Sequence, residues 1–328
     1  MTRGRHGARR EGHTADKKII AVVGATGAQG GGLVRAILRD AGGAFAARAL
    51  TRDVDSERAR ALAELGAEVV PADVDDEASL AEAFAGAYGA FCVTFYWAHL
   101  STEREIAQAE AMARAARGAG LRHVIWSTLE DTRRWVPLSD DRMPTLGAWK
   151  VPHFDGKGEA NRFFEDAEVP TTFLHTSFYW DNFIHFGMGP QRGEDGVLAI
   201  TFPLADRKLP SIAAEDIGKC AYGIFGRGAE LVGRSVGVAG EHLTGEQMAA
   251  ALTAALGREV RYDAVSPEAY RGLGFPGAND LGNMFQFKRD FNDEYCAARD
   301  VAFSRSLNPE LLTFDAWLTD NRDRIPIE

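Results

Sequence analysis

The sequence predicts an α/β protein built on a doubly wound parallel sheet, with a smaller, partly intertwined C-terminal α/β lobe. From residue 18 onward, short β-rich apolar runs alternate with longer segments rich in Ala, Glu and Arg. Such alternation is typical of parallel strands joined by crossover helices that cover both faces of the sheet. We expect strands at 19–23, 45–50, 68–71, 89–94, 123–127 and 171–175, and helices at 31–39, 57–65, 77–84, 102–119 and 157–166.

The regular alternation ends after Thr176. Aromatic and Gly/Pro-rich stretches run from 178 to 210, and we expect a helix at 214–225, a short strand at 235–238, a helix at 244–256 and a last irregular stretch. Because ligands of open α/β sheets bind outside the carboxyl ends of the strands, we interpret this part as a lobe that closes over the sheet. The predicted division is a disordered basic tail at 1–17, a nucleotide-binding domain at 18–182 and the smaller lobe at 183–328.

Composition limits the classes of partner. The net charge is −10, and the first 18 residues contribute +4, which leaves −14 on the remaining chain. This acidic body would repel nucleic acid phosphates, and no apolar run approaches the roughly 20 residues that span a bilayer. Three distant cysteines without CxxC or Cys/His spacing favour a reducing, cytoplasmic setting, without disulfides or a zinc site. His99, His175 and His185 also lack metal-ligand spacing, so we expect no metal.

A glycine-rich turn directly follows the first predicted strand. Gly24, Gly27 and Gly30 form a GxxGxxG pattern that leads into the first helix. The glycines permit a tight turn, close approach of backbone amides to a pyrophosphate and close packing of helix on strand, while the helix N-terminus adds partial positive charge. The order of strand, turn and helix predicts a Rossmann-type dinucleotide site. The residues expected to bind the cofactor in this turn are Gly24, Thr26, Gly27, Ala28, Gln29 and Gly30.

The end of the second strand carries the signal for cofactor choice. A carboxylate there would bind the ribose hydroxyls of NAD, whereas an arginine accommodates the 2′-phosphate of NADP. The sequence has Arg52 at this point, which favours NADP(H), although the adjacent Asp53 could turn inward and Arg52 could be a solvated turn residue. Two further strand ends lie along the expected cofactor path, with Asp73 and Val74 at the adenine and Thr94, Phe95 and Tyr96 at the ribose.

The region after the fifth predicted strand has a histidine four residues before a lysine. The layout resembles the atypical short-chain dehydrogenase/reductases, whose reductases use a YxxxK pair in which the Lys binds the ribose and the Tyr transfers a proton. None of the seven lysines has Tyr four residues before it, and His153 stands at that position before Lys157. Ser127, which ends the fifth strand, matches the assisting serine of that family.

Two interpretations of His153 stay open. An imidazolium can donate a proton near neutral pH, but the neighbouring Lys157 ammonium disfavours a second positive charge. In the first interpretation, His153 and Lys157 form a catalytic pair in which His153 is a weakened proton donor. In the second, Lys157 binds only the cofactor ribose and His153 is a residue at the helix entry. Tyr96 and Tyr179 are alternative proton donors.

Five segments give a more specific resemblance, to the NmrA-like family and its NADP-sensing branch. They are GATGAQGG at the glycine turn, VTFYW after the fourth strand, HFDGKGE at 153–159, GFPGANDLGNMFQF at 274–287 and LNPELLTFDAWL at 307–318. The resemblance runs from about Lys18 to Trp317 and implies a Rossmann-type NADP-binding domain whose family members include redox sensors. It also implies that Lys157 lies at the nicotinamide ribose and that the nicotinamide is bordered by Tyr179, Trp180, Asp181 and Asn182.

The chain departs from that family in an insertion at 131–152. Its Trp135, Pro137 and Trp149 would form either a substrate lid or a solvated loop. Aromatic residues also gather at two strand ends, at 95–97 and 178–180, where they would either wall a flat apolar pocket or be buried under the second lobe.

Two functions follow from these observations. The first hypothesis is a redox-responsive NADP(H) binder, supported by an intact dinucleotide site without the catalytic tyrosine. The second is an NADPH-dependent reductase of an aromatic, enone, quinone or imine small molecule, supported by the aromatic sheet edge. A homodimer or a protein partner would suit the first, and regulation through nucleic acid binding is weakest because the body is acidic.

Overall fold

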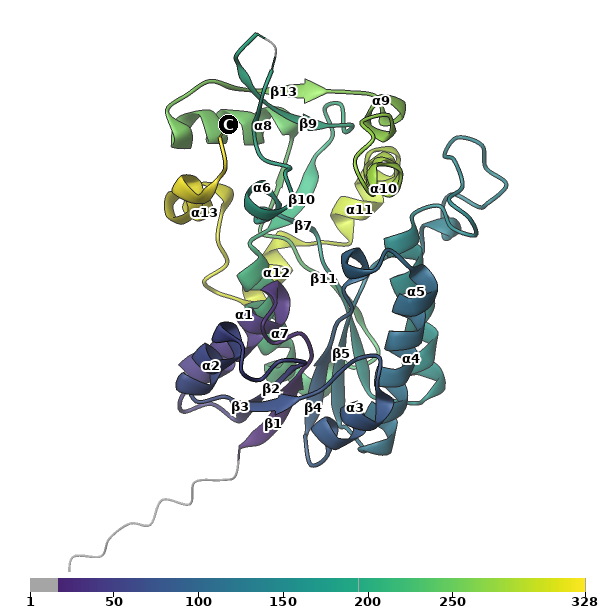
Figure 1. Ribbon diagram of the computed structural model, residues 1–328, viewed down its shortest axis with the longest axis vertical. Coiled ribbons are helices and arrows are strands. Elements are labelled where there is room, and N and C mark those ends of the chain that lie inside the picture. The colour runs from purple at the N-terminus through teal and green to yellow at the C-terminus, as the bar shows by residue number, and fades with distance from the viewer. Residues whose placement is uncertain (1–16, 194, 328) are drawn as a thin grey trace, which may run out of the picture.

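The computed structural model describes residues 17–193 and 195–327, so residues 1–16 of the predicted tail lie outside the described residues. Its larger lobe contains a seven-stranded sheet with the order β11-β6-β5-β4-β1-β2-β3, in which every neighbouring pair is parallel (Figure 1). The predicted doubly wound α/β fold is thus confirmed. The first six strands are β1 (Lys18–Val22), β2 (Phe45–Thr51), β3 (Glu68–Pro71), β4 (Gly89–Cys92), β5 (His123–Thr128) and β6 (Thr171–His175).

Five helices cross over between these strands, and two begin earlier than expected. Helix α1 begins three residues before the predicted start, and α5 begins five residues before it, with a proline in its first turn where the missing N–H is tolerated. The early start of α5 places His153 inside the helix. The crossover helices are α1 (Ala28–Arg39), α2 (Glu57–Glu64), α3 (Glu77–Phe84), α4 (Thr102–Gly118) and α5 (Pro152–Asp166).

The sheet is buried on both faces. Helices α3, α4 and α5 cover one face, where Trp126, Phe164 and Met112 belong to one core. On the other face, α1 and α7 (Ala214–Arg227) pack over Ile20, Val22 and other strand residues in a second core. Because helices cover both faces of the sheet, a ligand can reach it at the ends of the strands.

The second lobe has more regular structure than the sequence indicated. The stretches at 178–210 and after 256, which we expected to be irregular, contain strands and helices around a third core that includes Phe202, Phe285 and Trp317. Two small sheets, β12-β10-β7 and β13-β9-β8, lie in this lobe. Its elements are β7 (Phe178–Tyr179), α6 (Asn182–His185), β8 (Gln191–Arg192), β9 (Leu198–Phe202), β10 (Leu209–Ile212), β12 (Glu241–Leu243), α8 (Gly245–Leu256), β13 (Val260–Ala264), α9 (Pro267–Arg271), α10 (Ala278–Asp290), α11 (Asn292–Ala297) and α13 (Phe314–Asn321).

The two lobes are interleaved along the chain. Strand β11 (Ser235–Gly237) pairs with β6 and becomes the seventh strand of the main sheet, and α12 (Val301–Leu307) packs on α7. Segments from the C-terminal half therefore complete the larger lobe. The division of the chain at residue 182 stays a prediction.

The insertion at 131–152 is folded against its surroundings. Buried Asp155 of α5 accepts hydrogen bonds from the backbone N–H groups of Thr132, Lys150 and Val151 at 2.8–2.9 Å, and so fastens both ends of the segment. Asn283 of α10 donates to the carbonyl oxygens of Pro144 and Lys150. The insertion is thus attached to α5 and α10 by specific hydrogen bonds.

None of the helices within the described residues is both long and apolar enough to cross a membrane. The three cysteines are free thiols, with Cys92 and Cys220 buried and Cys296 partly buried.

Helices α1 and α7 approach closely because of glycine, which gives a first testable prediction. A Cβ on Gly218 of α7 would collide with the backbone nitrogen of Leu33 in α1. We expect Gly218→Ala to lower the free energy of unfolding by about 2 kcal/mol or more, since overpacking a tight contact between backbones forces the helices apart. Chemical denaturation followed by circular dichroism measures this change.

Gly226→Ala is the matched control in the same helix. Gly226 is exposed, and an added Cβ would have no neighbour within 4 Å. This variant should be neutral or up to about 1 kcal/mol more stable, because Ala favours the helix. Equal effects of the two substitutions would contradict the close packing of α1 on α7.

Candidate functional site

The glycine turn after β1 has the geometry of an anion cradle. Gly24 has a φ of +66°, and a Cβ on Gly30 would lie 2.5 Å from the carbonyl oxygen of Gly24. Helix α1 follows with Gly27 as its first flanking residue, and no side chain caps its first N–H groups. These donors are therefore available to a phosphate. Gly24, Gly27 and Ala28 are exposed, Thr26 and Gln29 are partly exposed, and Gly30 is buried under the turn.

In the loop after β2, Arg52 and Asp53 have different surroundings, and these bear on the choice between NADP and NAD. Asp53 accepts a hydrogen bond from the backbone N–H of Asp55 at 3.0 Å, so its carboxylate belongs to its own turn. Arg52 is exposed and forms no ion pair within the described part of the chain. The guanidinium is thus free to meet an anion beside the turn. After β3, Asp73 likewise accepts from the N–H of Asp75 and is half-buried beside Val74.

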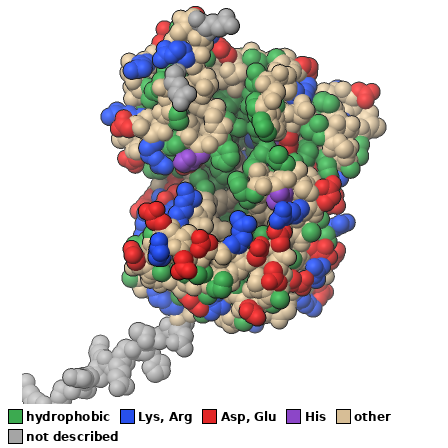
Figure 2. All heavy atoms as spheres, in the orientation of Figure 1, with side chains coloured by type: hydrophobic (Ala, Val, Ile, Leu, Met, Phe, Trp, Pro, Cys, Tyr) green, Lys and Arg blue, Asp and Glu red, His purple; other side chains and the backbone are tan. Residues whose placement is uncertain are grey.

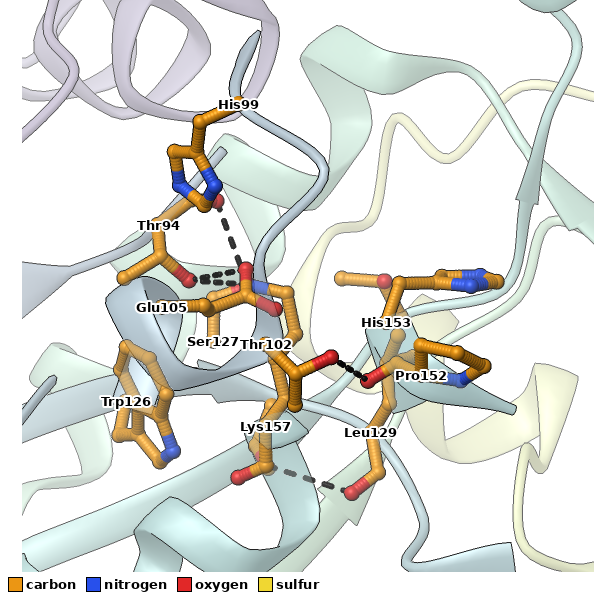
Figure 3. Close-up of polar contacts among 12 residues, drawn as sticks. Thr94, His99, Thr102, Glu105, Trp126, Ser127, Leu129, Pro152, His153 and Lys157 are labelled. Atoms are coloured by element: carbon orange, nitrogen blue, oxygen red, sulfur yellow. Dashed lines mark hydrogen bonds and ion pairs between the residues drawn. The ribbon is translucent and has the colours of Figure 1, made fainter. Parts of the chain in front are cut away.

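Lys157 is held by a buried polar cluster with Thr94 and with Glu105 of α4 (Figure 3). Its Nζ donates to Thr94 Oγ1 at 2.5 Å and lies 3.1 Å from Glu105 Oε1, while Thr94 donates to the same carboxylate at 2.7 Å. Glu105 of α4 has no exposed surface, and its Oε2 has no hydrogen-bond partner among the described residues. Sequence reasoning missed Glu105, whose position inside an ordinary helix gives no motif.

His153 lies one turn before Lys157 in α5 and is oriented by the second lobe. Its Nδ1 donates to Asp280 Oδ1 of α10 at 2.6 Å, and this leaves Nε2 without a hydrogen bond to the described residues. The rings of Tyr96 and Trp97 lie 5.9 Å and 4.9 Å from the imidazole. Asp280 lies inside the GFPGANDLGNMFQF segment, but nothing in that segment alone assigns it to His153.

A hydrogen-bond chain connects the glycine turn with the ends of β5 and β7. Ser127 Oγ donates to Gln29 Oε1 at 2.7 Å, and Gln29 Nε2 donates to Tyr179 Oη at the same distance. Tyr179 in turn donates to Thr176 Oγ1 at 3.3 Å, and burial raises the pKa of Tyr179 to about 12. Ser127 and Tyr179, which the sequence assigned to the catalytic end of the cofactor, are thus joined through Gln29 of the glycine turn. With its pKa raised, Tyr179 is a weak proton donor near neutral pH.

The other residues predicted at the nicotinamide occupy different environments. The Trp180 side chain has no exposed surface and stacks in the core of the second lobe, 5.3 Å from the Phe314 ring, which corrects its expected place at a cofactor pocket. Asp181 accepts a hydrogen bond from the first N–H of α7, and Asn182 begins α6. Burial, reinforced by the Asp280 carboxylate, raises the pKa of Tyr96 well above its usual value.

The aromatic residues at 95–97 and 178–180 do not form one pocket wall. Phe178 and Trp180 are core residues, whereas Phe95 is 57% exposed and Trp97 is half-buried. Within the described residues, no cluster of three His, Cys, Asp or Glu side chains is arranged to hold a metal ion. His99 accepts from the N–H of Ser101, His175 faces Glu130 at 3.7 Å and His185 is exposed at the end of α6.

These residues gather where a dinucleotide fits the fold. The turn after β1 lies at the switch point between β1 and β4, where doubly wound sheets bind ligands. A hollow separates the two lobes on this side, with hydrophobic side chains gathered on its walls (Figure 2). The open turn, the free guanidinium of Arg52 and the buried Lys157 match the phosphates and riboses of such a cofactor. His153 Nε2 adds a group that can hold a proton.

Comparison with known proteins finds relatives that match most of the chain. The chain is 29% identical over 302 residues to the NmrA-like family domain-containing oxidoreductase FrzB from Cladobotryum sp, with 85% of this chain and 86% of that protein covered. The crystal structure of NmrA, a negative transcriptional regulator in complex with NADP, matches with a TM-score of 0.75 and 24% identity, covering 92% of this chain and 94% of that one. The triphenylmethane reductase of Citrobacter sp., complexed with NADP(H), matches with a TM-score of 0.71 and 19% identity, covering 92% and 99%.

A family model extends these likenesses to nearly the whole sequence. The model of the NmrA-like family matches residues 16–318. This range includes the glycine turn, His153, Lys157 and Asp280. The chain therefore belongs to the NmrA-like family.

Proposed function

We propose that this protein binds NADP(H) and reduces a small unsaturated molecule, with His153 as the proton donor. The observation that carries the proposal is the position of His153 Nε2, which is free of other partners, one helical turn from Lys157 and oriented by the hydrogen bond from Nδ1 to Asp280. This is the relation of proton donor and lysine that the YxxxK pair has in related reductases. The name of FrzB as an oxidoreductase agrees with such an activity.

Binding of NADP(H) rests on the glycine turn and Arg52. The turn offers uncapped N–H groups to the pyrophosphate, and the engaged carboxylate of Asp53 leaves Arg52 as the group beside the adenosine ribose. Arg binds phosphate through paired, charge-assisted hydrogen bonds. NADP(H) in the matched NmrA and triphenylmethane reductase structures agrees with this choice.

The charges around α5 remove an objection that arises from the sequence alone. Lys157 and His153 would disfavour each other's positive charge, but Glu105 lies against Lys157 and Asp280 lies against His153. Two carboxylates therefore balance the two cations. Bound NADPH supplies a hydride to an electrophilic carbon of a C=N, C=O or conjugated C=C bond. His153 Nε2 then holds the proton that goes to the nitrogen or oxygen, and Lys157 orients the ribose.

Exposed apolar side chains on two loops near His153 indicate a substrate with an apolar body. Phe95 and Leu100 lie on the loop after β4, and Leu273 and Phe275 on the loop before α10; they are 38–57% exposed. The two loops meet, because a Cβ on Gly277 would lie 2.8 Å from the Trp97 ring. This surface suits an aromatic enone, quinone or imine better than a sugar or a charged acid.

The hydrogen bond between His153 and Asp280 also supports a second candidate, a redox sensor. It joins α5, beside the proposed cofactor, to α10 of the second lobe. Binding of the cofactor would therefore alter the contact between the two lobes. Such a sensor would respond to the ratio of NADPH to NADP⁺ through lobe closure, self-association or a protein partner. A homodimer or protein partner and a cytoplasmic location stay predictions in either case.

Arg52→Ala tests the choice of cofactor. The variant should bind NADPH at least about tenfold more weakly than the wild type and NADH with little change, because only NADPH carries the 2′-phosphate. Titration by isothermal calorimetry measures both affinities.

Arg58→Ala is the matched control, since Arg58 is exposed in the next helix. It should leave both affinities within about twofold of the wild type. Wild-type protein that binds NADH as tightly as NADPH would contradict the role of Arg52.

His153→Gln tests the proposed proton donor. NADPH oxidation is followed against a panel of quinones, enones and cyclic imines, and the variant should lose about 100-fold or more in kcat with little change in NADPH affinity. Asp280→Asn should lower kcat less, because Nε2 remains in the site. His185→Gln, an exposed histidine outside the site, should behave as the wild type.

The same panel separates the two candidates. Turnover in the wild type that Lys157→Ala abolishes would exclude a protein that only senses the cofactor. If no substrate consumes NADPH while the distribution of oligomers shifts with the NADPH to NADP⁺ ratio, the reductase proposal is wrong and the sensor is supported.

A further inference from the structure

A second cavity lies between α5, the β6–β11 edge of the main sheet and helices α10 and α11. Its floor is formed by β6 and β11, where His175, Ser235 and Gly237 line it, and one wall is formed by Gly158 and Asn161 of α5. The loop after β5 and helices α10 and α11 close it above. The cavity has a volume of about 330 Å³, at the lower end of the range for small-molecule sites.

Its lining combines flat apolar surfaces with two unpaired polar groups. Trp135, Phe287 and Phe291 supply aromatic rings, and the Trp135 and Phe287 rings pack edge to face at 5.5 Å. Tyr295 Oη and His175 Nε2 are buried without a hydrogen-bond partner among the described residues, and Tyr295 is only 3% exposed. Buried polar groups without partners are unfavourable, so both groups are suited to a ligand that satisfies them.

Glu130 at the cavity is neutralised by an ion pair, and a lysine without an ion pair among the described residues lies behind the lining. Glu130 forms a two-pronged ion pair with fully buried Arg299 at 2.7 and 3.0 Å, which leaves little negative charge to repel a ligand. Lys288 is 3% exposed, lies 5.4 Å from the centre of the Tyr295 ring and forms no ion pair in the described part of the chain. Burial lowers the pKa of Lys288 to about 7, as expected for a cation that lacks a counter-ion.

The mouth of the cavity adds one charge of each sign. Arg134 and Glu294 are exposed there, while Asp131 is paired with Arg133 at 2.8 Å. The charges at the mouth therefore cancel, and the groups inside the cavity determine the charge of the ligand.

The cavity is separate from the proposed dinucleotide site but connected to it. Helix α5 stands between them, with Lys157 turned to Thr94 on one side and Gly158 turned to Asp131 on the other. Arg299 Nε donates to the carbonyl oxygen of Thr176, whose hydroxyl accepts from Tyr179 in the hydrogen-bond chain that reaches the glycine turn.

We propose that this cavity is a second ligand site, which binds a small aromatic carboxylate independently of the reaction at His153. The ring lies among Trp135, Phe287 and Phe291, and the carboxylate accepts hydrogen bonds from Tyr295 Oη and from an N–H at His175 Nε2. The site goes beyond the proposed function, and it stands whether or not the protein is a reductase.

Binding of 1-naphthoate to the full chain tests the proposal, with and without saturating NADP⁺. Isothermal calorimetry should show one saturable site whose affinity changes less than twofold when NADP⁺ is present. Tyr295→Phe should weaken binding about fivefold, because one hydrogen bond to a carboxylate is lost. The neutral analogue 1-naphthalenemethanol should bind at least about tenfold more weakly than 1-naphthoate.

Two filling variants with one matched control locate the site. Ala298→Trp and Ser235→Trp place an indole in the cavity from two different elements, the end of α11 and β11, and each should abolish naphthoate binding. Ala297→Trp, at the adjacent exposed position outside the lining, should bind as the wild type. Thermal melts confirm that each variant is folded, and the two filling variants act on different elements, so the loss of fold in one leaves the other to decide.

The opposite results would overturn the proposal. Naphthoate that binds both filling variants normally is bound elsewhere, and naphthoate that NADP⁺ displaces occupies the dinucleotide cleft. Equal affinity for the alcohol would overturn the assignment of an anion. Failure of NADP⁺ itself to bind would count against the proposed function alone, because naphthoate binding is measured without it as well.

Discussion

The first two turns of α5 impose the constraint on which the site depends. His153, Asp155 and Lys157 are all buried there, and a buried charge without a partner destabilises a fold by several kcal/mol. Each side chain is therefore matched by a different segment: Asp280 of the second lobe, the two ends of the insertion, and Glu105 with Thr94. One helix thus fixes the relative positions of the second lobe, the insertion and the loop after β4.

This pairing changes the chemistry that the residues can perform. In isolation, a lysine one turn from a histidine makes the histidine a poor proton donor. With a carboxylate on each cation, the pair is close to neutral, and the imidazole is held with one nitrogen engaged and the other free. Geometry and charge compensation, rather than the identity of the two residues, are thus what supports the proposed role of His153 as a proton donor. The hydrogen bond from Lys157 Nζ also holds Thr94 in place just after the end of β4.

The sequence was a good guide where a pattern is local. The alternation of strands and helices predicts β1 to β6 closely, because this signal lies within a few residues, although α1 begins three residues before its predicted start. It was a poor guide to the second lobe, where short strands such as β9 and β10 are specified by pairing with distant segments. Asp280 and Glu105 were missed for the same reason, since each acts through a partner 127 and about 50 residues away. The first turn of α5 was not predicted because the segment contains glycines, which disfavour helices. Gly156 is needed there, because a Cβ would lie 2.5 Å from Thr102 of α4.

The replacement of a tyrosine by His153 carries a further consequence for the fold. A tyrosine donor of the YxxxK kind takes its activation from a lysine in the same helix, so one lobe contains the whole pair. A histidine donor takes its orientation from Asp280, which belongs to α10 and is carried by the second lobe. The proton donor is complete only when α10 packs against α5 as it does here. Under the proposed reduction, catalytic competence and the packing of the two lobes would be linked, because separation of His153 from Asp280 would remove the hydrogen bond that orients the donor. A reductase and a sensor would then differ only in whether a substrate reaches Nε2 of His153, whose side chain is 7% exposed.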